Sequence, residues 1–400
     1  MASALGKPSD VPTDVPVIIA TIFPEDGTTG VHTHFRQLSW VLKPQGTQVR
    51  VVTPFSWARP LTYFAFAPRL LLQYVSPPAS VIWYRHWHEV FLYKALRRDL
   101  SKIGSCVVYA QGPLEARAAL HARTGPHQRV VMAVHFRASQ ADEYAEPGRE
   151  IRRGSSIFKA IRQAERETIL QLDGIVYVAK WAQSALSSWL PEVERVPSII
   201  VANFVDPLPA DANEEPLGDL VTTGRLDERK NHRFLLEVLS EANKAGHALT
   251  LSIFGEGPLR KELERKIAAL GLEGNVRLWG YRKDVREFLP RYRAYVHAAH
   301  GEVSPLAVIE AMAAGLPIFA PGIGPIEELC DDGIEARFWQ LDDPTGAADI
   351  LLTLLTSEET RSKAADAAKE RFHRDYDASI LGPRLASFLF GTATSSSPYR

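Results

Sequence analysis

The chain has 400 residues, of which 46% are hydrophobic and 23% charged, and its formal net charge is −1. These values exclude a disordered or fibrous chain, and the near-zero charge gives no sign of a nucleic-acid-binding protein. The length exceeds one ordinary core and suits two domains of roughly 150–200 residues each. The two cysteines, Cys106 and Cys330, lie far apart in apolar surroundings. This usage predicts neither a disulfide framework nor a metal site and indicates a reducing compartment.

Residues 1–14 are polar and interrupted by prolines, so we expect a loose tail. They contain no basic region followed by an apolar stretch, as a secretory signal would. The apolar runs elsewhere are too short or too interrupted to cross a bilayer. We therefore expect a cytoplasmic protein.

The N-terminal half alternates between strand-like and helix-like segments. An apolar strand is expected at 15–22, followed by a loop rich in Gly and Thr and by a helix that presents Phe35, Leu38 and Leu42 on one face. With a strand at 49–53 this forms a βαβ unit of a doubly wound sheet. The same pattern predicts strands at 105–109, 130–134 and 174–178, and helices at 114–122 and 157–172.

Residues 201–219 contain three prolines and little apolar periodicity, so they are the candidate linker between two domains. After them the alternation restarts. It predicts strands at 219–223, 248–254, 275–278, 294–298 and 317–320, and helices at 233–245, 259–270 and 305–314. The fold class is therefore α/β, with two doubly wound domains and a cleft between them, where ligands collect at the carboxyl ends of the strands.

The segment 301–315, which reads GEVSPLAVIEAMAAG, carries the strongest functional signal. Ser304 is a suitable N-cap and Pro305 a suitable first helical residue, so a helix is expected to begin there. Its free N–H groups form an anion site suited to a diphosphate. Glu302 lies just ahead of that site, where its carboxylate can accept hydrogen bonds from sugar hydroxyls. Glu310 lies about 9 Å further along the helix, within reach of a second diol such as a ribose.

A second signal is the segment 223–232, TGRLDERKNH, at the end of the first strand of the second half. Arg225 and Lys230 stand where this strand gives way to a helix, on the side of the expected cleft. Two cations there can neutralise a diphosphate leaving group. A charged loop that only interacts with water is the alternative.

These motifs resemble those of family 4 of the retaining glycosyltransferases, also called glycosyl transferases group 1. The resemblance covers about residues 200–345 and rests on Gly224-Arg225-Leu226 with Lys230, on Phe254-Gly255-Glu256-Gly257-Pro258 and on the pair Glu302 and Glu310. The segment 201–206 resembles the family's interdomain segment, with Ala202 where a proline is usual. The family implies the GT-B fold of two facing Rossmann-like domains, in which the last helix returns to the first domain. We therefore expect an acceptor-side domain at 15–203 plus about 376–400 and a donor domain at 204–375.

The resemblance also implies roles for individual residues. Arg225 and Lys230 would hold the donor diphosphate, Glu302 the transferred sugar and Glu310 the ribose. The remaining donor contacts would come from Gly30, Gly255, Tyr281, Arg282, Ser304, Pro305 and Leu306. In the family Gly30 belongs to a glycine pair, whose other member is Thr29 in this chain.

His135 follows the strand at 130–134 and matches a histidine at the family's reacting centre; a core histidine at a strand end is the alternative. Gln111 stands where a histidine is common in the family. His32 and His34 lie two residues apart on different faces of a helix, which argues against a metal site and leaves them as acceptor-side candidates. We find no N-terminal carboxylate placed as a nucleophile, so we favour front-face transfer, in which the donor β-phosphate accepts the acceptor proton.

The segment 57–102 carries seven Lys and Arg against Glu89 and Asp99, with ten aromatic residues between them. Such a segment suits anionic lipid headgroups, since aromatic rings favour the membrane interface. Packing against the core, with a charged face in water, is the alternative. Localisation at the inner membrane face is therefore left open.

The sequence thus predicts an enzyme that moves a sugar from a UDP- or GDP-sugar to a hydroxyl acceptor, either a glycan or a lipid-linked glycan. Neither a cofactor nor a metal is expected, because cationic side chains and a helix N-terminus take the metal's role. Two alternatives stay open. One is a nucleotide-sugar epimerase of the same fold, and the other is a non-catalytic protein that binds sugar nucleotides.

Overall fold

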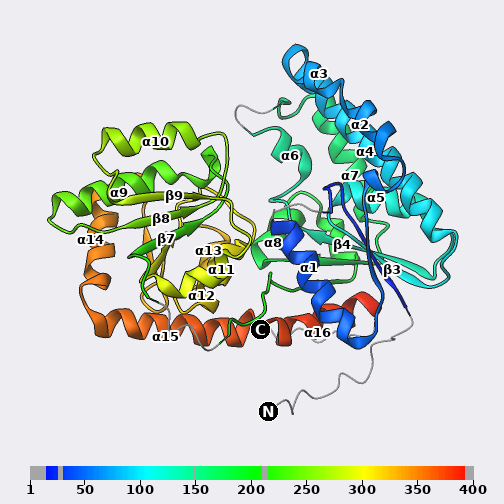
Figure 1. The fold of residues 1–400 in the computed structure, drawn as a ribbon. Helices are drawn as coiled ribbons and strands as arrows, with labels where there is room; N and C mark the ends of the chain where they lie inside the picture. The colour runs from blue at the N-terminus through cyan, green and yellow to red at the C-terminus, as the bar shows by residue number, and fades with distance from the viewer. Residues whose placement is uncertain (1–14, 26–29, 147–149, 210–214, 392–400) are drawn as a thin grey trace. The chain divides into compact units, whose positions relative to one another are not determined.

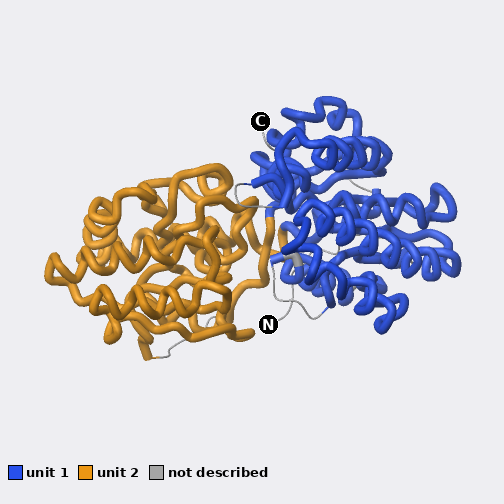
Figure 2. The backbone as a smooth tube through the Cα atoms, turned by 90° about the horizontal axis from the view of Figure 1, so that it is seen from above, with its two compact units in different colours: residues 1–202, 381–400 blue, residues 203–380 orange. Residues whose placement is uncertain are grey.

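The structure is a computed structural model that describes residues 15–25, 30–146, 150–209 and 215–391. The expected N-terminal tail, Thr29 and the serine-rich segment 392–397 lie outside these ranges. The chain divides into two compact units (Figure 2). Unit 1 comprises residues 1–202 and 381–400, and unit 2 comprises residues 203–380.

Unit 1 is built on a six-stranded parallel sheet in the order β2-β1-β3-β4-β5-β6. Every residue of β1, β3 and β5 is buried, as expected for parallel strands covered on both faces. The strands are β1 (Val17–Ala20), β2 (Val49–Val52), β3 (Cys106–Ala110), β4 (Gln128–Val134), β5 (Gly174–Tyr177) and β6 (Ser198–Ile200).

Helices flank this sheet (Figure 1). Phe35, Leu38 and Leu42 are buried on the inner face of α1, as their spacing predicts. The helices are α1 (Gly30–Leu42), α2 (Arg59–Phe66), α3 (Arg69–Val75), α4 (Pro77–Leu100), α5 (Pro113–Ala122), α6 (Gln140–Tyr144), α7 (Ser156–Ile169) and α8 (Lys180–Ser187), with 3₁₀ turns η1 (Lys43–Gln45), η2 (Pro54–Ser56) and η3 (Pro191–Arg195).

Unit 2 repeats the architecture with a six-stranded parallel sheet in the order β12-β11-β10-β7-β8-β9. Its core gathers around Phe234, Phe319 and Trp339. The strands are β7 (Leu220–Thr223), β8 (Leu251–Phe254), β9 (Val276–Gly280), β10 (Ala294–Val296), β11 (Ile318–Pro321) and β12 (Ala336–Trp339). The helices are α9 (His232–Lys244), α10 (Arg260–Ala269), α11 (Val285–Phe288), α12 (Leu306–Ala313), α13 (Pro325–Leu329), α14 (Pro344–Leu355) and α15 (Glu358–Asp375), with turns η4 (Glu228–Lys230) and η5 (Leu289–Arg291).

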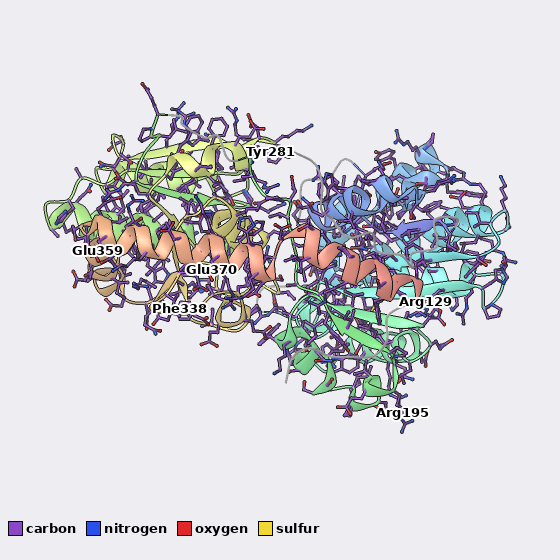
Figure 3. The ribbon with its side chains drawn as sticks, turned by 90° about the horizontal axis from the view of Figure 1, so that it is seen from below. Arg129, Arg195, Tyr281, Phe338, Glu359 and Glu370 are labelled. Carbon is purple, nitrogen blue, oxygen red and sulfur yellow. The ribbon has the colours of Figure 1, made fainter. Side chains whose placement is uncertain are left out.

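The last helix, α16 (Ala378–Phe390), begins in unit 2 and belongs to unit 1 from Leu381 onward. Leu385 and Leu389 are fully buried. Gly382 lies so close to α1 that a Cβ there would meet a methyl group of Val41 at 2.5 Å. Arg129 of β4, which is labelled in Figure 3, lies over the ring of Phe388. The C-terminal segment is therefore an integral part of the unit 1 core.

The expected fold class, two doubly wound α/β domains, is confirmed. The edge strands β6 and β12 were missed, because each is short and only partly buried and so lacks a continuous apolar run. Within the described ranges, no helix combines the length and apolarity needed to cross a membrane.

Candidate functional site

The two strongest motifs lie side by side in unit 2. Strands β7 and β10 are hydrogen-bonded parallel neighbours, so the loops that follow them share the carboxyl edge of the sheet. The Arg229 carbonyl accepts a hydrogen bond from the His300 N–H at 3.0 Å, which joins the two loops directly. Across this junction Lys230 Nζ lies 2.5 Å from Glu302 Oε1, and Arg229 lies 3.6 Å from Glu302 Oε2.

This ion pair is largely enclosed, since about one seventh of each side chain is exposed (14% for Lys230 and 13% for Glu302). Burial alone would raise the pKa of Glu302, but Lys230 and Arg229 hold it below its usual range. Lys230 is directed by its backbone: Asp227 caps the η4 turn, and Asn231 then takes a left-handed conformation with φ of 50°. The sequence motif thus places one cation and one carboxylate together at the sheet edge.

Two histidines that sequence reasoning missed lie beside this pair. His297 directly follows β10, and burial lowers its pKa to about 3, with a further contribution from Lys230. Burial and Lys230 likewise lower the pKa of His232 to about 4. His297 Nε2 and His232 Nδ1 are buried and have no hydrogen-bond partner within the described part of the chain. Both rings are therefore neutral at pH 7. The signal that could have found His297 is its position at the carboxyl end of a buried strand.

The helix after Glu302 begins one residue later than expected. Ser304 is not the N-cap: Pro305 takes that position with ψ of 102°, and α12 begins at Leu306. The reason is a competing hydrogen bond. The Ser304 carbonyl accepts from Asn203 Nδ2 at 2.8 Å, while the Val308 N–H donates to the Pro305 carbonyl. Pro305 has no N–H, so the donors that α12 offers to an anion are the N–H groups of its first turn, beginning with Leu306.

Glu310 is connected to a part of the chain that the sequence did not link to it. Burial raises the pKa of Glu310 to about 7, Arg286 opposes this and Asp206 adds to it. Arg286 Nε lies 4.0 Å from Glu310 Oε1, and Arg286 Nη1 donates to Asp206 Oδ1 at 2.7 Å. Arg286 thus connects Glu310 to the segment at the start of unit 2. Its place between two carboxylates has no signature in the sequence.

The glycine motif at 255–258 packs against the loop that carries Arg225. The Leu226 N–H donates to the Glu256 carbonyl at 3.0 Å. A Cβ on Gly255 would lie 1.8 Å from the Gly224 carbonyl oxygen, and one on Gly257 would lie 2.3 Å from the Leu226 carbonyl oxygen. These glycines therefore allow two backbones to touch. The Arg225 side chain is 69% exposed and pairs with Asp227 at 3.6 Å.

Tyr281 and Arg282 follow β9 on the same sheet. The Tyr281 side chain is 46% exposed and stands at the surface of unit 2 (Figure 3). Arg282 forms two hydrogen bonds with Asp284, at 2.9 and 2.6 Å, and lies over the ring of Phe288. The β9 edge meets the glycine motif, since the Gly255 N–H donates to the Gly280 carbonyl at 2.8 Å.

In unit 1 a polar group forms at the carboxyl edge of the sheet. His135 Nε2 lies 3.1 Å from Gln111 Oε1, and His34 Nε2 lies 2.9 Å from the Tyr109 hydroxyl. The His34 and His135 rings are 4.7 Å apart, nearly edge to face. Burial, with His34 nearby, lowers the pKa of His135 well below its usual value. The structure therefore brings together Gln111, His34 and His135.

His32 and Gly30 have other surroundings on α1. His32 Nε2 is bonded to the Pro24 carbonyl at 2.7 Å, and its ring contacts Phe23 and Phe35. Gly30 is the first residue of α1. A buried carboxylate of unit 1 was also missed: Glu115, on the first turn of α5, accepts the Ile22 N–H at 3.3 Å, and burial raises its pKa to about 7.

Across the described ranges, no three His, Cys, Asp or Glu side chains lie close enough to hold a metal ion. Cys106 and Cys330 are both buried and free.

Comparisons with known proteins agree with this arrangement. Residues 211–371, all within unit 2, match the family model described as glycosyl transferases group 1. The phosphatidyl-myo-inositol mannosyltransferase of Mycobacterium leprae is 25% identical over 376 residues, covering 92% of this chain and 94% of that protein. The enzyme of the same name from Mycolicibacterium smegmatis is also 25% identical, over 374 residues, with 89% and 88% covered.

Solved structures share the fold over nearly the whole chain. Sucrose-phosphate synthase from Thermosynechococcus elongatus superposes with a TM-score of 0.74 at 16% identity, covering 95% of this chain and 100% of that chain. Anabaena HepE in complex with UDP-glucose gives a TM-score of 0.67 at 16% identity, with 94% and 99% covered. Residues 211–371 therefore resemble the glycosyl transferases group 1 family, and the chain is a glycosyltransferase with the GT-B fold.

Proposed function

We propose that this glycosyltransferase retains the anomeric configuration of a nucleoside-diphosphate sugar and works without a metal ion. The observation that carries the proposal is the enclosed Lys230–Glu302 pair at the carboxyl edge of the unit 2 sheet, just ahead of α12. An ion pair this well enclosed adds little net stability, because burying two charges costs about as much as their attraction returns, and this supports a functional role. We propose that the donor separates them, so that Lys230 binds the diphosphate and Glu302 accepts sugar hydroxyls.

The proposed transfer takes place on one face of the sugar. The acceptor oxygen forms a bond to the anomeric carbon while the bond from that carbon to the β-phosphate oxygen breaks. The acceptor proton passes to the departing phosphate, so atoms and charge balance without an enzymic nucleophile. Lys230, Arg225 and the first N–H groups of α12 stabilise the nucleoside diphosphate as it leaves. The residue roles assigned to Gly255, Tyr281, Arg282, Ser304, Pro305 and Leu306 remain predictions of this proposal.

For unit 1 we propose that the edge carrying His34, Gln111 and His135 serves the sugar and its acceptor. The depressed pKa of His135 supports a neutral ring there, which can exchange hydrogen bonds with hydroxyl groups. The two mannosyltransferases named above carry a phosphatidylinositol in their names, which supports a lipid-linked acceptor over a free glycan. We therefore propose a peripheral protein at the cytoplasmic face of a membrane that uses a UDP- or GDP-sugar.

Nucleotide binding tests the donor site. UDP, GDP, ADP and their sugars are added to the wild type, to Lys230→Ala and to the control Lys244→Ala, whose exposed amine pairs with Glu241 on α9. A nucleotide at 100 times its dissociation constant should stabilise the wild type by about 2.7 kcal/mol. The control should respond in the same way and Lys230→Ala far less. An equal response of Lys230→Ala would contradict the assigned role.

Product analysis tests the chemistry. The product of the transfer is expected to have the same anomeric configuration as the donor, read from proton NMR, and the rate should be unchanged by EDTA. An inverted product would contradict front-face transfer, and a rate that EDTA abolishes and Mg²⁺ restores would contradict metal independence.

An epimerase remains the second candidate, because unit 1 does hold a buried carboxylate of raised pKa, Glu115. Its Oε1 already accepts the Ile22 N–H, which favours a structural role. Incubation of the donor without any acceptor separates the two candidates. An epimerised nucleotide sugar would support the second.

A further inference from the structure

Helices α2 and α3 present an apolar surface to solvent. The seven residues of α3 are all described and none is buried, and Thr62 is the one buried residue of α2. Phe64 and Tyr74 are each 82% exposed. This α2–α3 surface is formed by Leu61, Tyr63, Phe64, Leu70, Leu71, Tyr74, Val75 and, at the start of α4, Ile82. Contiguous exposure of this kind marks an interaction site.

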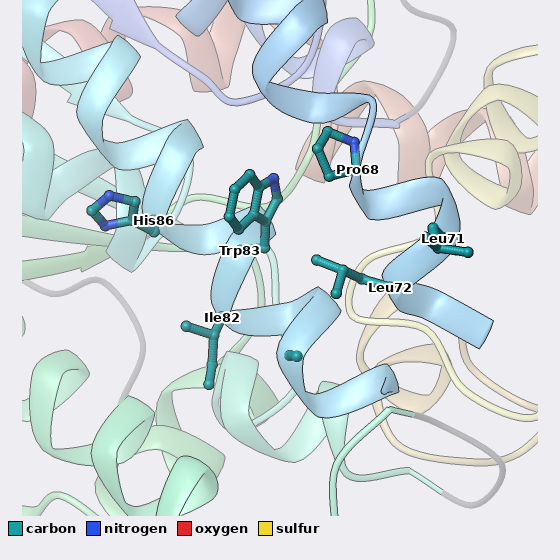
Figure 4. A pocket seen from close by; sticks show the side chains of 7 residues that line it. Pro68, Leu71, Leu72, Ile82, Trp83 and His86 are labelled. Carbon is teal, nitrogen blue, oxygen red and sulfur yellow. The ribbon is translucent and has the colours of Figure 1, made fainter. Parts of the chain in front are cut away.

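A groove opens within this surface between α3 and α4. Its volume is about 440 Å³, and Figure 4 shows Leu72 of α3 and Trp83 of α4 on its two sides. Leu71 and Ile82 belong both to the groove and to the exposed surface, so the two are continuous. The Trp83 N–H donates to the Ala65 carbonyl at 2.7 Å, which leaves the apolar part of the ring to line the groove. The remaining lining residues are Pro68, Ala79 and His86.

The segment that forms this surface carries charges of one sign. Between Asp26 and Glu89 the chain contains no acidic residue, whereas Arg59, Arg69 and Arg85 lie in α2, α3 and α4. The segment around Ile151 adds charges of both signs, the half-buried Glu150 and the exposed Arg152. It lies beside this surface, because Ile151 packs with Val81 of α4. An apolar surface bordered by arginines complements a layer of anionic headgroups above acyl chains.

We propose that the α2–α3 surface docks on an anionic phospholipid bilayer and that the groove takes one lipid acyl chain. This rests on the proposed function, which it deepens by naming the element that contacts the membrane. A second copy of the chain fits less well, because a twofold contact would bring together two surfaces that are both bordered by arginines. Each of the two earlier alternatives for segment 57–102 therefore applies to a different part of it. Helices α2 and α3 face outward, while the buried residues of α4, such as Phe91 and Leu92, belong to the core.

Vesicle flotation with the full chain tests the docking. The vesicles contain equal parts phosphatidylglycerol and phosphatidylcholine, or phosphatidylcholine alone. The double variant Phe64→Ser, Leu71→Ser should bind the anionic vesicles roughly a hundredfold more weakly than the wild type, since two large apolar side chains are lost. The control Ile334→Ser removes an exposed apolar side chain (54%) from unit 2 and should bind as the wild type does.

The groove has its own test. Vesicles whose acyl chains carry bromine should quench the wild-type tryptophan fluorescence, and Trp83→Phe should lose a large part of that quenching. Equal quenching in Trp83→Phe would overturn the acyl chain in the groove. The docking would be overturned if the double variant bound anionic vesicles as strongly as the wild type does. It would also be overturned if the wild type bound neutral and anionic vesicles equally well. The wild type could also fail to bind vesicles and instead self-associate in sedimentation velocity, with the double variant remaining monomeric. That result would overturn the bilayer and identify a second copy of the chain as the partner of this surface.

The two proposals fail in different ways. Nucleotide stabilisation should be unchanged in the double variant, because its substitutions lie in unit 1, far along the chain from Lys230 and Glu302. Absence of any nucleotide response in the wild type would count against the donor site while the vesicle result stands on its own.

Discussion

Gly255→Ala tests whether the glycine motif acts by close backbone contact. Gly255 has φ of +148°, where a residue with a side chain is strained, at a cost of about 1–3 kcal/mol. The new Cβ would also lie 1.8 Å from the Gly224 carbonyl oxygen and 2.8 Å from its carbon. Both are backbone atoms, so relief requires the β7 loop to move, and overpacking of this kind costs about another 1–3 kcal/mol. The expected loss is about 2–6 kcal/mol in the free energy of unfolding of unit 2.

The displaced loop carries Arg225 and leads to Lys230, so nucleotide binding should weaken along with stability. The control is Gly271→Ala, where φ is +65° and no described heavy atom lies within 4 Å of the added Cβ. It carries the conformational cost alone, about 1–2 kcal/mol. Urea unfolding and nucleotide titration are measured on both variants. Equal losses of stability, with equal nucleotide affinity, would refute the close-contact argument.

Three further changes have defined outcomes. Arg286→Gln removes the cation beside Glu310 and raises the pKa of Glu310, which is already near 7. Nucleotide affinity measured by calorimetric titration should therefore fall about tenfold at pH 7 and recover at higher pH. A loss of affinity that does not depend on pH would show that Arg286 has only a structural role. Burial raises the pKa of Glu115 from 4.5 to about 7, so its stabilisation is fully present below pH 4.5 and is lost as the pH rises through about 7. Glu115→Gln should therefore make the thermal midpoint less dependent on pH between 5 and 8, and an unchanged dependence would contradict this. Leu385→Ala should lower the free energy of unfolding of unit 1 by about 2–5 kcal/mol. Amide hydrogen exchange should then become faster in β4 but not in β8. Equal acceleration in both strands would show that the two units do not unfold separately.

The alternation of apolar strands and amphipathic helices was enough to predict both parallel sheets. It succeeded because strands buried on both faces, such as β1 and β3, are continuous apolar runs. The juxtaposition of Lys230 and Glu302 could also be anticipated, since both follow strands whose carboxyl ends lie at one edge.

The helix start at Ser304 could not be predicted correctly, because the decisive hydrogen bond comes from Asn203, about a hundred residues away. The role of Arg286 could not be predicted for the same reason, because its two carboxylate neighbours, Asp206 and Glu310, are distant from it in sequence. Long-range pairs of this kind carry no local periodicity. The outward-facing α2–α3 surface was left as one of two alternatives, since composition alone does not say which side of a helix meets the core.

The burial of α16 in unit 1 has a consequence for the order of events during protein synthesis. Unit 2 is one continuous stretch, residues 203–380, and all of it has left the ribosome before Leu385 and Leu389 emerge. The core of unit 1 cannot be completed before these two side chains are available, although its other residues are synthesised earlier. The domain translated first is therefore the one completed last, and until then the surface that α16 covers on α1 and β4 is open to chaperones or to wrong partners.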